Sequence, residues 1–158
     1  MSNILTQIDH QSIRTNQSSI IILLLAAFVL NLPWLVGIVA LFMLAGTVMK
    51  RPGFAFIYQL LLKPAGVVKP LLVNDNAEPH RFAQGFGALV LTGATLAFLV
   101  DAGLIGWALS WLVIGLAALN LFVGYCVGCA VYYWLNKLNI PGFTKSPPEG
   151  TLPGMRPK

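Results

Sequence analysis

The two cysteines of the chain, Cys126 and Cys129, form a Cys-x-x-Cys motif inside its last long apolar stretch. On a continuous helix they would lie roughly 60° apart on one face, because each residue turns the helix by about 100°. Their Cα atoms would then be about 5 Å apart, within the range that a disulfide accepts. Such a pair predicts a thiol site that cycles between dithiol and disulfide, or that passes sulfur or electrons to a partner.

The cysteines also have other interpretations. No Lys or Arg lies within a helical turn of the pair to favour a thiolate, and small cysteines often serve only as buried packing residues. A metal site would need two more ligands. The histidines of the chain, His10 and His80, are both expected on the cytoplasmic side and could converge, but their spacing does not indicate a site. Ala130 stands where a haem-attachment motif requires histidine. We therefore expect no metal and no cofactor.

A polar cluster lies at the start of the third apolar stretch and contains Glu78, His80, Arg81 and Gln84, with Asp75 close before them. Glu78 followed by Pro79 is typical of the first turn of a helix, and Arg81 would lie among lipid headgroups. The cluster is therefore interpreted as a helix start, with an anion or lipid-phosphate site as the alternative.

Three residues near the cysteines suggest close helix packing. Gly124 and Gly128 form a small-x-x-x-small pair, which allows two membrane helices to approach closely. Asn120 is costly at membrane depth unless it bonds to a neighbouring helix. These residues predict interhelical contacts, and a polar element in a substrate or quinone site is the alternative.

The composition requires a membrane around most of the chain. Of the 158 residues, 57% are hydrophobic and only 9% are charged, and mean hydropathy is +0.77. So short a soluble protein could not bury that much apolar surface. The net charge of +5 comes from Lys and Arg between the apolar stretches, as the positive-inside rule predicts, and not from a basic patch with interleaved aromatics. We expect contact with membrane lipids and none with nucleic acid.

The pattern predicts an all-α polytopic membrane protein with four transmembrane helices in two tandem hairpins. Hairpin one covers about residues 16–50, where Pro33 favours two crossings over one long helix, and hairpin two covers about 82–135, with a continuous helix over 105–135. They form a single domain within residues 1–137, and residues 138–158 are expected to be a flexible basic tail. The expected hairpin tips lack Lys and Arg, so both termini and the central loop should be cytoplasmic, at a bacterial inner membrane.

A faint internal repeat supports the two hairpins. Arg14 and Gln17 have the same spacing as Arg81 and Gln84, 67 residues later. Each Arg precedes an expected tip by about 20 residues, so both hairpins would point the same way, as in parallel repeats.

Three segments of the second half resemble a bacterial membrane family, domain-of-unknown-function family 4395. They are residues 78–87 (EPHRFAQGFG), 116–120 (LAALN) and 124–132 (GYCVGCAVY). The resemblance covers about residues 9–137, and it implies a membrane fold without implying an activity. The chain departs from the family pattern at Tyr125, where Phe is usual, and at Ala130, where an acidic residue is common.

Together these observations favour a thiol-redox or sulfur-handling membrane protein that uses Cys126 and Cys129. Its partner would be a thioredoxin-like protein or a membrane complex. The alternative is a non-catalytic scaffold or accessory subunit of a larger membrane complex, and so few polar residues at membrane depth argue against a transporter.

Overall fold

The computed structural model describes residues 6–66 and 68–157, and this part of the chain is mostly helical. Its elements in chain order are β1 (Thr6–Asp9), α1 (His10–Val29), α2 (Pro33–Val48), α3 (Ala55–Ile57), the π-helical turn η1 (Tyr58–Leu62), β2 (Leu72–Asp75), α4 (Ala77–Leu99), α5 (Gly103–Ala118), the π-helical turn η2 (Leu119–Val123) and α6 (Val127–Lys137).

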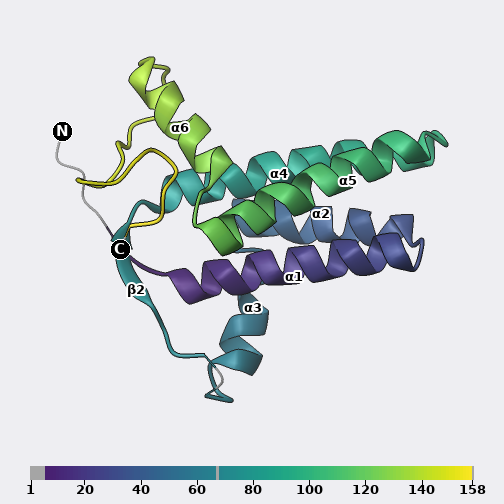
Figure 1. The fold of residues 1–158 in the computed structure, drawn as a ribbon, viewed down its shortest axis with the longest axis horizontal. Coiled ribbons are helices and arrows are strands. Elements are labelled where there is room, and N and C mark those ends of the chain that lie inside the picture. The colour runs from purple at the N-terminus through teal and green to yellow at the C-terminus, as the bar shows by residue number, and fades with distance from the viewer. Residues whose placement is uncertain (1–5, 67, 158) are drawn as a thin grey trace.

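The four longest helices lie side by side (Figure 1). Helix α1 packs against α2 and α5, and α4 packs against α2 and α5, so the four close into a ring. Short turns join α1 to α2 and α4 to α5, and both turns lie at the same end of the molecule (Figure 1). Strand β2 and α6 lie at the opposite end, and α3 lies beside α1 on the half of the bundle nearer that end (Figure 1).

The two turns have the same backbone geometry. Asn31 and Asp101 adopt left-handed conformations, with φ of 51° and 58°. The next amide in each turn, that of Leu32 or Ala102, donates to a carbonyl five residues back, at 2.8 and 2.9 Å. Such left-handed caps satisfy the free carbonyls at a helix end, and Asn and Asp tolerate them better than most residues. The matched turns fit the repeat expected from the sequence.

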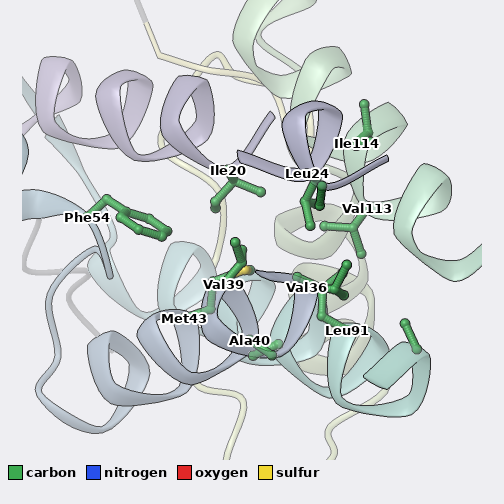
Figure 2. Packing of buried hydrophobic residues seen from close by; sticks show 13 residues of the cluster. Ile20, Leu24, Val36, Val39, Ala40, Met43, Phe54, Leu91, Val113 and Ile114 are labelled. Carbon is green, nitrogen blue, oxygen red and sulfur yellow. The ribbon is translucent and has the colours of Figure 1, made fainter. Parts of the chain in front are cut away.

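The core of the ring contains the inward-facing apolar side chains (Figure 2). It includes Ile20, Leu24, Val36, Val39, Ala40, Met43, Leu91 and Val113. Large apolar side chains also cover the outside of the same helices, among them Ile22, Leu41, Leu89, Leu96 and Leu112. An apolar exterior of this extent is typical of helices that face lipid. Three helical segments are long and apolar enough to cross a membrane, at residues 10–29, 77–99 and 103–123.

The expected continuous helix over residues 105–135 is wrong. The helical run of α5 and η2 ends at Val123, and α6 begins at Val127 and points away from the bundle (Figure 1). Gly124 makes the break with φ of +76°, a conformation that a residue without a Cβ adopts at little cost. Gly124 and Gly128 therefore do not share one helix face.

Strands β1 and β2 pair antiparallel, with Thr6 opposite Asp75 and Asp9 opposite Leu72. Each strand directly precedes the first helix of a hairpin, so their pairing joins the starts of the two hairpins. Asp9 caps α1 by accepting from the Gln11 amide at 3.0 Å, and it also accepts from the Tyr58 hydroxyl at 2.6 Å. These bonds tie α1 to η1.

The segment after α6 runs back towards the bundle. The Cys126 amide donates to the Gly154 carbonyl at 2.7 Å, and the Arg156 amide donates to the Gly124 carbonyl at 2.9 Å. The flexibility expected of residues 138–158 stays a prediction, but the described part of this segment lies on the domain.

A candidate thiol site at the start of α6

Cys126 and Cys129 lie where α6 begins. Cys126 is the N-cap residue, and its Sγ accepts a hydrogen bond from the Cys129 amide at 3.2 Å. The two cysteines form a disulfide, with their Cα atoms 5.2 Å apart. The predicted closeness of the pair is thus confirmed, although a helix start and not a continuous helix produces it. The free amides and dipole of a helix start stabilise a thiolate on the capping cysteine.

His80 and Asp75 extend the site on the side of Cys129. His80 Nδ1 lies 3.5 Å from Cys129 Sγ, and His80 Nε2 lies 2.8 Å from Asp75 Oδ2. Asp75 ends β2 and His80 lies in the first turn of α4, so the short connection between these elements sets the geometry. A carboxylate that orients an imidazole beside a sulfur is an arrangement that can move a proton to and from a thiol.

His10 approaches the same carboxylate from the start of α1. Its Nε2 lies 3.2 Å from Asp75 Oδ2, without the angle of a good hydrogen bond, and its side chain is buried. Burial alone would raise the pKa of the Asp75 carboxyl. The two imidazoles, together with the Asn76 amide 2.7 Å from Oδ1, reverse this effect and hold that pKa below its usual range. Asp75 therefore stays charged beside the imidazoles.

The C-terminal segment covers the outer side of the pair. Arg156 donates from its guanidinium to the Asn120 carbonyl at 2.9 Å, which fixes the segment to η2. Gly154 has φ of +86°, and a Cβ there would lie 2.7 Å from the Cys126 carbonyl. Its lack of a side chain lets the segment lie directly on the first turn of α6. Cys126 and Cys129 are consequently only 6% and 3% exposed.

The residues of the expected polar cluster have separate contacts. Glu78 accepts from the Tyr132 hydroxyl at 2.9 Å, which joins α4 to α6. Gln84 donates to the Met43 carbonyl at 3.0 Å and so joins α4 to α2. Arg81 is exposed, and His80 alone approaches the cysteines.

Gly128 is in close contact with α4. A Cβ at this position would lie 2.5 Å from the Ala83 Cβ, so the first turn of α6 packs directly on α4. The contact lies within the chain, and it does not involve Gly124.

A comparison with protein families places the chain in a known group. The chain matches a domain of unknown function, DUF4395, over residues 8–137. The chain belongs to the DUF4395 family. The resemblance seen in the three sequence segments is thus confirmed. No curated protein matches this DUF4395 chain, and no solved structure matches it either.

A cavity of about 220 Å³ opens beside the thiol site of the DUF4395 chain, far larger than one water requires. It lies between the four long helices and the start of α6. Cys126 lines it, as do His80, Arg81, Gln84 and Asn120. The cavity is therefore lined by members of all three groups found in the sequence, namely the cysteine pair, the polar cluster and the packing residues.

Two groups of side chains in the described part of the DUF4395 chain have ligand atoms close enough to hold a metal ion. One is His80 with Cys126 and Cys129, and the other is His10 with Asp75 and His80; within each group the ligand atoms lie within 4.8 Å of one another. The expectation of no metal rested on sequence spacing, which does not reveal this convergence. The cysteines of the first group are joined in a disulfide, and a metal would require their thiolates.

Sequence reasoning placed Asp75 near the polar cluster without a role, and it missed Gln17 and Arg156 as parts of the site. Gln17 was noted only for its spacing in the repeat, yet it is buried and lines the cavity. Arg156 lies in the segment expected to be flexible, and the sequence carries no signal of its contact with Asn120.

Proposed function

We propose that this DUF4395 chain is a membrane thiol–disulfide exchange protein whose reactive groups are Cys126 and Cys129. The observation that carries the proposal is the pair at the start of α6, with His80 and Asp75 aligned behind Cys129. Two buried packing cysteines would need neither a helix start nor an oriented imidazole.

The exchange takes place in two balanced steps. A partner thiolate attacks Cys126 Sγ and forms a mixed disulfide, while Cys129 leaves as a thiolate and receives a proton through His80. A second partner thiolate then attacks the mixed disulfide and releases Cys126 as a thiolate. Two partner thiols become one disulfide, and the pair becomes a dithiol with the two electrons. The reverse direction oxidises the pair.

We further propose that the two hairpins cross the bacterial inner membrane four times, with the thiol site on the cytoplasmic side. The tips carry no Lys or Arg, and the basic residues of the described part of the chain lie near or beyond the opposite ends of the long helices. Helix α2 has 16 residues, about 24 Å of helix against a hydrocarbon core of about 30 Å, so it crosses with local thinning of the bilayer. The cytoplasm keeps most thiols reduced, which suits a pair that cycles.

A single-cysteine experiment tests this topology. In a chain with both Cys126→Ser and Cys129→Ser, Asp101→Cys should react with a membrane-impermeant maleimide added to intact cells. The matched variant Lys69→Cys should react only after the cells are opened. Labelling of Lys69→Cys in intact cells would overturn the orientation.

A protein partner, thioredoxin-like or part of a membrane complex, would reach the sulfurs only if the C-terminal segment moved aside, because its residues 154–156 lie against Gly124 and Cys126. The scaffold alternative has less support. It would use Gly124 and Gly128 to pack against another protein, but Gly128 already packs against Ala83 within the chain.

Redox titration of the purified protein tests the exchange. The chain is equilibrated with oxidised and reduced dithiothreitol at a series of ratios, and free thiols are then counted by mass after alkylation. Both thiols should appear together in one reversible two-electron transition, and Thr92→Ser, far from the site in α4, should behave identically. A pair that alkylates equally at every ratio, or one that never becomes reduced, would refute the proposal.

A further inference from the structure

The cavity beside Cys126 is positively charged at its edge and apolar inside. Lys50, Arg51 and Arg81 line it, and its described lining contains no Asp or Glu. Its inner walls are formed by apolar residues of the long helices, such as Ile20 and Val113. Charges of one sign beside low-dielectric walls concentrate ligands of the opposite charge.

A buried polar group in the cavity lacks a partner. Gln17 is 8% exposed, and its Oε1 makes no hydrogen bond within the described part of the chain. Its counterpart in the repeat, Gln84, accepts from the Gly53 amide at 3.2 Å, in the segment after α2. The equivalent segment after α5 is broken at Gly124, and the cavity lies beside this break. A bound ligand that carries a hydrogen-bond donor would satisfy this buried acceptor oxygen.

The cavity also reaches one of the two cysteines. The C-terminal segment covers the outer side of Cys126, and Gly154 contacts the first turn of α6. Cys126 nevertheless lines the cavity. A molecule small enough to enter can therefore approach Cys126 while the segment stays in place, and a folded protein cannot.

We propose that the exchange partner is a small anionic thiol, or its disulfide, bound in this cavity. Its acidic group lies near Arg51 and Arg81, and its sulfur faces Cys126. The inference rests on the proposed exchange activity and names its substrate class. In the reductive direction, the bound thiolate attacks Cys126 Sγ, Cys129 leaves, and a second molecule of the thiol releases the first as a symmetrical disulfide. Two thiols lose two electrons and two protons, which the cysteine pair takes up.

The test compares three small thiols of different charge. The full chain, purified in its disulfide form in an uncharged detergent at low salt, is reduced by 3-mercaptopropionate, 2-mercaptoethanol or cysteamine. Each rate is divided by the rate of the same thiol with a small uncharged disulfide, which corrects for intrinsic reactivity. We expect the anionic thiol to be about tenfold faster than the cationic one, at the low end of the effect of a focused charge.

Two double variants separate the cavity from general surface charge. Arg51→Gln with Arg81→Gln should reduce the charge preference to within twofold, and 0.5 M salt should weaken it in the unaltered chain. Lys63→Gln with Lys69→Gln removes the same net charge outside the cavity and should leave the preference unchanged. A preference that survives the first pair, or that is lost in the second, would overturn the assignment.

The outcomes also distinguish this inference from the exchange activity and from lipid binding. Equal corrected rates for all three thiols would leave the exchange intact and overturn the anionic substrate. No reduction by any thiol would refute the exchange itself. Anionic phospholipid added as mixed micelles should leave the rate of the anionic thiol within twofold. Strong inhibition would assign the cations to a lipid phosphate instead.

Discussion

Replacing His80 with Asn in a chain that also carries Cys126→Ser tests the role of the imidazole directly. Cys129 is then a single free thiol, and proton transfer to His80 Nδ1 produces a thiolate and an imidazolium about 3.5 Å apart. Asp75, 2.8 Å from the other ring nitrogen, stabilises the imidazolium. Asn removes this partner while it keeps a polar side chain of similar reach.

Coulomb's law sets the size of the effect. Two unit charges 3.5 Å apart attract by roughly 1.2 kcal/mol in a dielectric of about 80 and by roughly 5 kcal/mol in one of about 20. Because the His80 side chain is only 21% exposed, the lower figure is the minimum expected. Since 1.36 kcal/mol corresponds to one pH unit, thiolate formation should require about one pH unit more after the substitution.

The assay is the pH dependence of Cys129 alkylation by iodoacetamide, measured by intact mass. The midpoint of the profile should move up by about one unit in His80→Asn. The rate at one pH is less informative, because a more basic thiolate is also more nucleophilic and partly compensates. Tyr132→Phe, which alters α6 on its Glu78 side, serves as the matched control and should leave the midpoint in place. A shift below about 0.3 units in His80→Asn would refute the reasoning.

Three further predictions concern packing, titration and acid stability. Gly128→Ala should lower the free energy of unfolding by about 1–3 kcal/mol in thermal melts, because the added Cβ would lie 2.5 Å from Ala83 of α4. Gly115→Ala, whose Cβ would have nothing within 4 Å, should not destabilise the fold. Equal melting temperatures for the two variants would contradict the close packing. Tyr58 should titrate in absorbance at about pH 12, because burial and its bond to Asp9 raise its pKa to about 12, and an ordinary value near 10 would show that the bond is absent. The lowered pKa of Asp75 adds stability to the fold. This stability is fully present above about pH 4, the ordinary range of Asp, and is lost as the pH falls towards the native pKa. Thermal melts from pH 6 to 3 should show that Asp75→Asn is less acid-sensitive than the unaltered chain, and parallel curves would argue against this role.

The long helices of the fold follow from local sequence signals. Pro33 has no amide hydrogen and begins a helix readily, so the division of the first apolar block into α1 and α2 was predictable. The turn around Asp101 was predictable for a similar reason, since a charged residue interrupts two apolar runs. Both depend on neighbouring residues only.

The break at Gly124 depends on distant contacts. An apolar run that contains glycines is typical of one membrane helix. The sequence around Gly124 resembles the sequence around Gly115, which lies inside α5. The difference is that the backbone after Gly124 bonds to Gly154 and Arg156. Contacts between residues about 30 positions apart leave no periodic signal, and the same limit explains why Arg156 was missed.

The thiol site was predictable in part. The spacing of Cys126 and Cys129 indicated the pair, and His80 belonged to the expected cluster. The alignment of His80 with Asp75 depends on how β2 leads into α4, and the approach of His10 depends on strand pairing. Sequence spacing alone does not determine either distance.

The pairing of β1 with β2 also imposes an order of events during synthesis. Thr6 cannot pair until Asp75, 69 residues later in the chain, has been synthesised. At ~5–20 residues per second, synthesis of this stretch takes about 3 to 14 s. Until then the first hairpin carries a strand edge without a partner, and His10 has no carboxylate to meet. The cover over Cys126 comes still later, with Gly154 and Arg156. The protected thiol site is therefore completed only after both hairpins and the following segment have been made.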